Sequence, residues 1–282
     1  MKILVTGGNG YVGSHVVKTL LDERHEVLVC DVMSDFVDQR AQIFHVNIFE
    51  HQDDVYERFQ RPDACLHLAW RNGFVHNAPT QMGDLSAHYR FLTSMIEGGL
   101  RHLAVMGSMH EVGYWEGKID EETPCSPLSQ YGIAKDALRR SMMLYCKEKN
   151  VVLQWLRGYY IYGHDDRNHS IFTKLLEAEQ RGEVLFPFTT GKTKYDFISV
   201  DELALQIASA VTQTEVNGII NCCSGSPVSL AETVESYIRE NGLKIRLDYG
   251  KYPDRPYDSP MIYGDATKIQ QILHRQNKKS NV

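Results

Sequence analysis

The sequence has no excess of positive charge, and this argues against a nucleic-acid-binding protein. It carries 30 Lys and Arg against 36 Asp and Glu, which gives a formal net charge of −6 at pH 7. Binding to a phosphate backbone requires clustered Lys and Arg. Here the basic residues are scattered, apart from Lys278-Lys279 near the end of the chain. We therefore expect no nucleic-acid partner.

The sequence also lacks the cysteine spacings of metal and disulfide sites. None of its 6 cysteines forms a C-x-x-C pair, and no histidine cluster has zinc-ligand spacing. Cys30 and Cys65 adjoin apolar runs that are typical of buried strands. We interpret the cysteines as reduced core residues and expect no metal site.

Long hydrophobic runs, internal repeats and low-complexity linkers are missing as well. No apolar run approaches the ~18 residues of a membrane span. The chain enters an apolar strand at once, at Lys2-Ile3-Leu4-Val5, without the pattern of a secretory signal. We therefore expect a cytoplasmic protein with no membrane partner.

What the sequence does contain is a regular alternation of short β-branched runs and longer amphipathic stretches. This pattern predicts βαβ units and therefore a parallel sheet that is covered on both faces, the Rossmann-type doubly wound α/β fold. The predicted strands are Ile3–Thr6, Glu26–Cys30, Ile43–Val46, Ala64–Leu68, His102–Met106 and Val151–Leu156, and the helices between them are Tyr11–Arg24, Gln52–Phe59, Leu85–Gly98 and Gln130–Lys149.

After Leu156 the chain becomes richer in loops, which indicates a smaller C-terminal lobe. Helices are predicted at Ile171–Arg181, Asp201–Thr212 and Leu230–Asn241. We expect a dinucleotide-binding domain over 1–160 with a returning segment at about 195–220. The smaller lobe is then expected over 161–194 and 221–282.

A glycine-rich turn joins the first strand to the first helix. Its sequence is Thr6-Gly7-Gly8-Asn9-Gly10-Tyr11-Val12-Gly13. Glycines at 7, 10 and 13 permit a tight turn, close approach of backbone N–H groups to a pyrophosphate, and close packing of helix on strand. The helix N-terminus adds free N–H donors and a positive dipole end. A tight turn without a ligand is the alternative, but the position between strand and helix favours nucleotide binding.

Asp31 closes the second predicted strand. An acidic residue in this position accepts hydrogen bonds from an adenosine ribose and repels a 2′-phosphate, which favours NAD over NADP. The alternative is an ordinary capping or turn aspartate.

Tyr131 and Lys135 place a phenol and an ammonium one helical turn apart on the same face. A phenol titrates near pH 10, and a nearby cation lowers that pKa by favouring the phenolate. The pair is therefore a candidate acid/base. The same spacing recurs at Tyr114/Lys118 and Tyr145/Lys149, so spacing alone does not choose among them.

Context favours Tyr131. It begins a predicted helix and follows Ser108, which comes just after the strand His102–Met106. Tyr114 lies in a glycine-rich loop, whereas Tyr145 lies far along the helix. The Ser108–Tyr131 combination is the one that places a hydroxyl and a phenol together at the ligand-binding edge of the sheet.

The glycine turn TGGNGYVG, Asp31, Ser108 and YGIAK together resemble the extended short-chain dehydrogenase/reductase family, with its nucleotide-sugar epimerases, dehydratases and reductases. The resemblance spans most of the chain. It implies an NAD cofactor, with Asn47-Ile48 beside the adenine and Leu68-Ala69 beside the phosphates. It also implies that Lys135 binds the nicotinamide ribose, and that the smaller lobe binds the nucleotide sugar.

The resemblance places Ser108, Met109 and Glu111 on the substrate side. It makes Arg255 a candidate for the substrate diphosphate and Asn168 a candidate substrate ligand, although an ordinary surface or loop role stays open for both. Many relatives have Ser or Thr where this chain has Met109, so either Ser108 supplies that hydroxyl or it is missing. Sugar dehydratases have a Thr-Asp-Glu run at this position, because the elimination of water needs an additional acid and base. This chain keeps only the Glu of that run, Glu111, which argues against a dehydratase.

By resemblance we expect an NAD-dependent reductase of the C4 keto group of a nucleotide-linked 4-keto-6-deoxyhexose. The strings GSMHEVGYWEG and YPDRPYDSP look like those of short bacterial 4-ketoreductases. The first alternative is a C4 epimerase that uses the same residues. An alternative of another class is a non-catalytic dinucleotide sensor, against which the intact Ser108, Tyr131 and Lys135 argue.

Family members often form homodimers through the helix that carries the Tyr and Lys. Leu138, Met142 and Tyr145 on this helix are candidates for such an interface, and burial in the core is the alternative.

Overall fold

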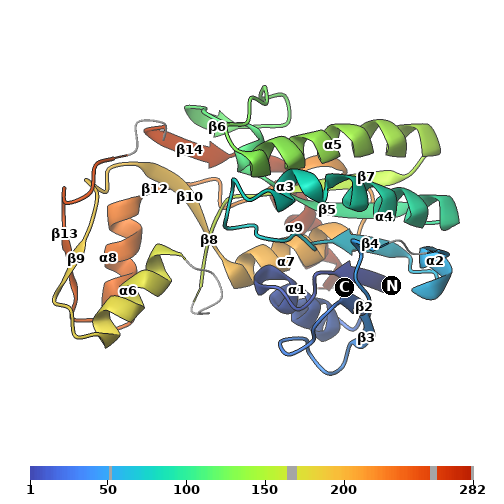
Figure 1. The fold of residues 1–282 in the computed structure, drawn as a ribbon, viewed down its shortest axis with the longest axis horizontal. Helices are drawn as coiled ribbons and strands as arrows, with labels where there is room; N and C mark the ends of the chain where they lie inside the picture. The colour runs from blue at the N-terminus through green and yellow to red at the C-terminus, as the bar shows by residue number, and fades with distance from the viewer. Residues whose placement is uncertain (51–52, 164–169, 255–258, 281–282) are drawn as a thin grey trace.

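The computed structural model describes residues 1–50, 53–163, 170–254 and 259–280, with a large sheet at one end of the molecule and a smaller lobe at the other (Figure 1). Among these residues, no helix is both long and apolar enough to span a membrane.

The large sheet has seven parallel strands in the order β11-β7-β5-β4-β1-β2-β3. The chain winds outward from β1 in one direction and then, starting at β4, in the other. The predicted Rossmann-type α/β fold is therefore confirmed. A crevice at the carboxyl ends of β1 and β4 is the place where this topology binds ligands. The strands are β1 (Lys2–Thr6), β2 (Glu26–Asp31), β3 (Gln42–His45), β4 (Ala64–His67), β5 (His102–Ser108), β7 (Val152–Gly158) and β11 (Gly218–Cys222).

Helices cover both faces of this sheet, because its strands are apolar on both sides (Figure 1). One core lies under α1 (Tyr11–Asp22), α7 (Val200–Val211) and α9 (Thr267–Ser280). The other lies under α2 (Val55–Arg58), α4 (Leu85–Gly98) and α5 (Gln130–Lys149), with the short α3 (Thr80–Gly83) leading into α4.

The helix α5 begins at a well-formed cap, since the Ser129 hydroxyl accepts the Gly132 N–H at 3.1 Å. Its Leu138 and Met142 are 1% and 0% exposed and belong to the core against the sheet. Of the two interpretations of these residues, core packing is therefore the correct one. Tyr145 is half-buried against the same core.

The smaller lobe contains a second sheet in the order β12-β10-β14-β6, with β8 paired to β10, and a separate β9–β13 pair. Helices α6 and α8 enclose an apolar core of their own, which includes Phe172, Phe188 and Tyr237 (Figure 1). The elements are β6 (Gly117–Ile119), β8 (Tyr160–Tyr162), α6 (Ile171–Gln180), β9 (Leu185–Pro187), β10 (Lys194–Ser199), β12 (Pro227–Ser229), α8 (Leu230–Glu240), β13 (Arg246–Asp248) and β14 (Met261–Gly264).

Three of the described elements, β6, β10 and α9, cross the boundaries predicted from the sequence. The strand β6 lies within 1–160 but pairs with β14 of the second sheet. The strand β10 lies at the start of the predicted returning segment, yet it pairs with β12 and β14 rather than with the large sheet. Within that segment α7 and β11 return to the large sheet, and α9, from the predicted smaller lobe, packs against the large sheet as well.

A buried carboxylate joins the two sheets. Asp196 of β10 is 0% exposed and accepts the backbone N–H groups of Ser224 (2.8 Å), Gly225 (3.0 Å) and Gly264 (3.0 Å), together with the Ser224 hydroxyl (2.6 Å). Ser224 and Gly225 follow β11, and Gly264 ends β14. One side chain therefore fixes the end of the large sheet against two strands of the second.

We predict that Asp196→Ala lowers the free energy of unfolding by about 3 kcal/mol, because it leaves several buried donors without an acceptor. Chemical denaturation measures this change. The matched control is Asp201→Ala, since the Asp201 side chain is 85% exposed and pairs with His15 at the surface. Its loss should cost less than about 1 kcal/mol. Equal effects of the two substitutions would contradict the joining role of Asp196.

Candidate active site

The glycine turn after β1 is too crowded for side chains at two of its three predicted positions. A Cβ on Gly13 would lie 2.1 Å from the Gly7 carbonyl oxygen. Gly7 has a φ of +74°, and a Cβ there would lie 2.6 Å from backbone atoms of Ala69. Gly10 N–H donates to Gly7 O at 3.1 Å and caps α1 without a side chain. The turn therefore lies directly against the Leu68-Ala69 segment that follows β4.

Tyr11 and Val12 occupy the first turn of α1. Tyr11 is 9% exposed, and its ring packs edge-on against His15 at 5.9 Å. Its hydroxyl lies 2.6 Å from the position that a Cβ on Gly163 would take, close to the end of β8. Val12 packs against the core beneath α1. The backbone of these two residues carries the N–H groups of the helix N-terminus.

Asp31 ends β2 and lies beside the glycine turn. Its Oδ2 accepts the Asn9 N–H at 3.0 Å, and its Oδ1 accepts the Val32 N–H at 2.8 Å. Asn47 and Ile48 follow the neighbouring strand β3. The Asn47 amide donates to Glu50 at 3.0 Å, whereas Ile48 is 5% exposed and belongs to the core.

These features fit a dinucleotide. The turn leaves the N-terminus of α1 without side-chain caps, which suits a pyrophosphate, and the Asp31 carboxylate beside it suits ribose hydroxyls.

Ser108 and Tyr131 come together from different elements. Ser108 ends β5 and caps the short 3₁₀ helix η1 (Met109–Glu111), where its Oγ accepts the His110 N–H at 3.3 Å. Tyr131 lies in the first turn of α5, and its backbone N–H donates to His76 O at 2.8 Å. The Ser108 hydroxyl lies beside the Tyr131 phenol and acts to lower its pKa. Hydroxyl and phenol therefore meet at the carboxyl edge of the large sheet, as the sequence predicted.

The other two Tyr/Lys pairs have different neighbours, although Tyr114 lies on the wall of the cavity that His76 and His110 also line. Tyr114 is 47% exposed and its hydroxyl donates to Glu116. The Tyr145 hydroxyl donates to Glu97, and Lys149 pairs with the same carboxylate at 2.9 Å. Neither phenol has a neighbouring serine among its recorded contacts, so the geometry favours Tyr131.

Lys135 is buried one turn beyond Tyr131. It is 2% exposed, and its Nζ donates to Met106 O at 2.7 Å. The same nitrogen lies 3.7 Å from the centre of the Trp70 ring and 5.8 Å from that of Tyr131. Burial lowers the pKa of Lys135 to about 7, against the raising effect of the nearby Glu111 charge.

The pKa of Tyr131 differs from the expectation. We expected the ammonium to lower it, but burial and the Glu111 charge raise it to about 12, opposed by the Ser108 hydrogen bond. The reason is geometric, because the ammonium is directed at Met106 O and the Trp70 face. The phenol is therefore protonated at neutral pH.

Glu111 does not occupy the predicted place beside the substrate. It is 0% exposed, and its carboxylate accepts the Ser108 N–H at 2.7 Å and the Trp155 Nε1–H at 2.9 Å. Arg139 and Arg157 lie 3.4 and 3.6 Å away. A side chain without accessible surface cannot contact a substrate, so Glu111 acts by holding the Ser108 backbone. The family resemblance placed Glu111 on the substrate side, but its burial excludes contact with a substrate.

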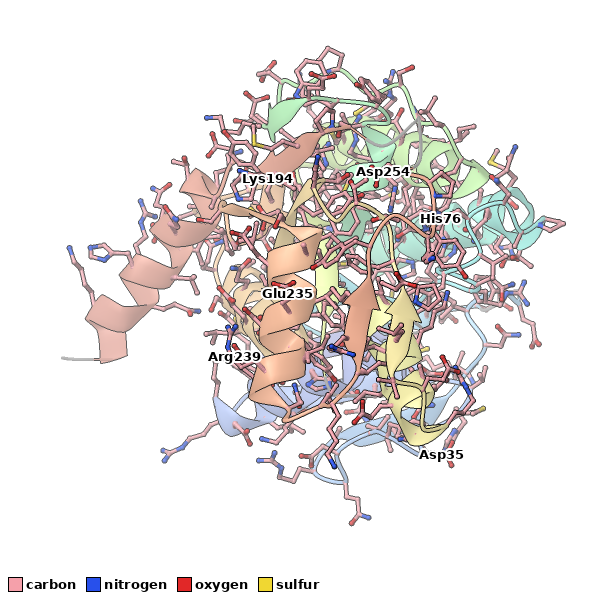
Figure 2. All side chains as sticks on the ribbon, turned by 90° about the vertical axis from the view of Figure 1, so that its left-hand side faces the viewer. Asp35, His76, Lys194, Glu235, Arg239 and Asp254 are labelled. Atoms are coloured by element: carbon pink, nitrogen blue, oxygen red, sulfur yellow. The ribbon has the colours of Figure 1, made fainter. Side chains whose placement is uncertain are left out.

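A cavity of about 960 Å³ is lined by His76 and His110, whose rings contact that of Tyr131. Tyr131 itself is not among the residues that line it. Met109, His110 and Ser129 line it from the large-sheet side, and Thr189, Tyr195 and Phe197 line it from the smaller lobe. Met109 thus lies on the cavity wall, as expected for a residue on the substrate side. Figure 2 looks onto the smaller lobe and labels His76 and Asp254, which also line the cavity. The candidates Asn168 and Arg255 lie outside the described residues.

His76 and His110 were missed by sequence reasoning. The His76 ring stacks on the Tyr131 ring at 5.1 Å with an interplanar angle of 12°, and it lies 4.4 Å from the His110 ring. His76 comes from the loop before α3, which carries no motif. His110 lies between Met109 and Glu111 in the sequence, and this position was the one signal available for it.

Comparisons with known proteins place these features in one class, the NAD-linked enzymes that modify sugars. The model of the "NAD dependent epimerase/dehydratase family" matches residues 3–223. The chain is 43% identical to the dTDP-6-deoxy-L-talose 4-dehydrogenase (NAD(+)) of Aggregatibacter actinomycetemcomitans over 270 residues, which cover 94% of this chain and 99% of the relative. It is 24% identical to a UDP-glucose 4-epimerase of Lactobacillus helveticus, with 100% and 94% of the two chains covered.

Solved structures agree on the fold. A UDP-N-acetylglucosamine 4-epimerase from Methanobrevibacter ruminantium M1, in complex with UDP-N-acetylmuramic acid, superposes with a TM-score of 0.83 at 20% identity, covering 96% of this chain and 91% of the other. MoeE5 in complex with UDP-glucuronic acid and NAD gives 0.82 at 23% identity, covering 97% and 93%. The chain belongs to the NAD dependent epimerase/dehydratase family. The predicted family resemblance, including its closer likeness to 4-ketoreductases, is confirmed.

We predict that Asp31→Ala shifts cofactor preference from NAD toward NADP, because a carboxylate beside a 2′-phosphate repels it. Dissociation constants for both cofactors, measured by titration, check this. Asp35→Ala removes the same charge from an exposed position on the following loop and should leave the preference unchanged. An unchanged ratio of the two dissociation constants in Asp31→Ala would refute the ribose role.

Proposed function

We propose that this protein is an NAD-dependent oxidoreductase that reduces the C4 keto group of a nucleotide-linked 4-keto-6-deoxyhexose. The observation that carries the proposal is the Ser108–Tyr131 pair beside a cavity of about 960 Å³, with the NAD-binding features of the glycine turn across the crevice. The relative that is 43% identical, named as an NAD(+) 4-dehydrogenase of a deoxyhexose, supports the substrate class.

The residues of the site divide the work of carbonyl reduction. Bound NADH supplies the hydride that C4 receives. Tyr131 donates its phenolic proton to the oxygen that gains charge as the carbonyl becomes an alcohol. Ser108 Oγ, beside that phenol, hydrogen-bonds the same oxygen and so holds it in line. Ser108 then supplies the hydroxyl that Met109 lacks.

The protonation states are those that proton donation to a carbonyl oxygen requires. A phenol with a pKa of about 12 is in its acid form at neutral pH and is ready to donate a proton. Lys135 has a pKa of about 7, so its side chain is cationic below that pH and loses its charge as the pH rises through that value. We assign this amine to the nicotinamide ribose, in keeping with the family.

The cavity is suited to a large polar substrate. Its volume lies at the upper end of the range of about 300–1,000 Å³ for small-molecule sites. The Thr189, Thr193 and Asp254 side chains on its wall offer hydrogen bonds to sugar hydroxyls, and the Tyr195 and Phe197 rings offer flat apolar faces. We assign the nucleotide sugar to this cavity.

A homodimer through α5 remains part of the proposal, with different residues from those first considered. Leu138 and Met142 face the core, whereas Leu144 is 73% exposed and Ile133 and Met143 are 39% and 38% exposed on the same helix. The exposed set would form the contact.

We predict that Tyr131→Phe lowers kcat by about 10²-fold or more, because the ring remains but the proton donor is lost. Steady-state rates with the 4-keto sugar and NADH measure this, and NAD binding should persist. Tyr145→Phe removes a phenol from the other end of the same helix and should keep the wild-type rate. Near-normal turnover by Tyr131→Phe would show that another group carries the proton.

The reaction class itself is testable. With a nucleotide-linked 4-keto-6-deoxyhexose and added NADH, we predict stoichiometric loss of the reduced-nicotinamide absorbance as the 4-hydroxy sugar accumulates. A reductase must release NAD⁺ in each cycle, so labelled NAD⁺ should exchange readily. Purified protein that keeps its NAD⁺, ignores NADH and interconverts two C4-epimeric sugars would establish an epimerase instead. Absence of any turnover across a panel of nucleotide sugars would favour the sensor.

A further inference from the structure

We propose that Trp70 is a positioning residue for the reaction. Its indole face holds the ammonium of Lys135 in place and stabilises the charged form of that lysine. This proposal deepens the function proposed above and rests on it for its catalytic consequence. Trp70 follows β4 directly after the Leu68-Ala69 segment, where no motif predicted a role for it.

The contact between the two side chains is close. Lys135 Nζ lies 3.7 Å from the centre of the Trp70 ring, well inside the distance of about 6 Å over which a cation is attracted to an aromatic face. The Trp70 ring meets the Tyr131 ring edge-on at 5.9 Å. Trp70 therefore touches both members of the acid/base pair.

The ammonium needs this contact because its surroundings offer little else. Among the residues that the structure describes, Met106 O is its recorded hydrogen-bond acceptor, although an ammonium has three donors. Glu111, which favours its charge, already accepts from Ser108 and Trp155 and lies beside two arginines. A buried cation with so few partners would lose its proton readily.

The ionisable groups around Lys135 come from four elements. Glu111 of η1 raises its pKa, and Tyr131 shares its helix α5. His67 of β4 and His88 of α4 lie on the far side, and burial lowers the pKa of both histidines, with a further lowering by the lysine charge. Both imidazoles are therefore neutral at physiological pH and do not repel the ammonium.

The indole itself is fixed from behind. His88 stacks on it with ring centres 4.3 Å apart and an interplanar angle of 12°. Trp70 Nε1 donates to Gln81 Oε1 at 2.7 Å, and Gln81 Nε2 donates to Asn72 O at 2.8 Å. Held on its back and at its edge, the ring presents its free face to Lys135.

The test follows the Lys135 charge in the protein without cofactor or substrate. Protein grown with lysine labelled with ¹³C at Cε is titrated by NMR, and Lys135→Met assigns the signal. In the wild type, the protons on Cε of Lys135 should be shifted upfield by the indole ring. In Trp70→Leu this upfield shift should vanish. The pKa of Lys135 should fall by about one unit, which is a tenfold rise in its acid dissociation constant.

Two further variants separate the aromatic face from general packing. Trp70→Phe keeps a weaker aromatic face and should give a smaller fall in the pKa of Lys135 than Trp70→Leu. Gln81→Met removes the hydrogen bond at the indole edge but keeps the face, so the Lys135 titration should remain close to that of the wild type. Thermal unfolding of every variant verifies that it is folded. Equal titrations of Lys135 in wild type and Trp70→Leu would overturn the proposal, as would equal effects of Gln81→Met and Trp70→Leu.

The pH dependence of kcat/KM for the 4-keto sugar then links the charge to the reaction. Its high-pH limb, where the Lys135 cation is lost, should move to lower pH in Trp70→Leu by the same amount as the NMR titration. If the high-pH limb of kcat/KM is unchanged in Trp70→Leu while the pKa of Lys135 measured by NMR falls, the proposed role of Trp70 in the reaction is overturned. If the wild type turns over no nucleotide sugar but the NMR titrations behave as expected, the proposed function fails and the effect of Trp70 on Lys135 stands.

Discussion

The buried carboxylate of Glu111 is the interaction on which the geometry of the site depends. It is 0% exposed, and taking such a charge out of water is costly unless it is paired and hydrogen-bonded. Here it receives the Ser108 N–H from β5 and the Trp155 indole N–H from β7, with Arg157 of the same strand and Arg139 of α5 close by. One side chain thereby connects the end of β5, the middle of β7 and the helix of the acid/base pair.

This anchoring explains why the reactive groups stand on rigid elements. Ser108 cannot move without breaking the capping box that it forms with Glu111. Tyr131 is held through its backbone by His76 O, and its ring lies between His76 and Trp70. The smaller lobe, in contrast, contributes cavity walls and is fixed to the large sheet by Asp196. The cavity is thus walled by residues of both parts of the fold, whereas Ser108 and Tyr131 belong to elements of the large sheet's part.

Much of this arrangement was predictable because its signals are local. The glycine turn, Asp31 and the strand–helix alternation depend on residues close in sequence, and Tyr131 was distinguished by its place at a helix start. The role of Glu111 could not be predicted, since its burial follows from Trp155 and Arg157, which are remote in the sequence. The contacts of His76 and Trp70 with Tyr131 also join distant segments. Strands such as β6 and β8 have three residues each, too few to show a period.

The two unusual titrations beside Glu111 have a common cause. Burial penalises a charged group, so it raises the pKa of an acid such as Tyr131 and lowers that of a cation such as Lys135. The Glu111 charge raises the pKa of both groups. At Lys135 it therefore opposes the effect of burial, whereas at Tyr131 it adds to that effect. The same desolvated corner therefore keeps the phenol in its acid form and brings the amine near its midpoint at neutral pH. Proton donation to a carbonyl oxygen requires the first of these states, whereas a base that removes a proton from an alcohol would need the phenolate. Both protonation states thus follow from where β5 ends and how completely its end is buried.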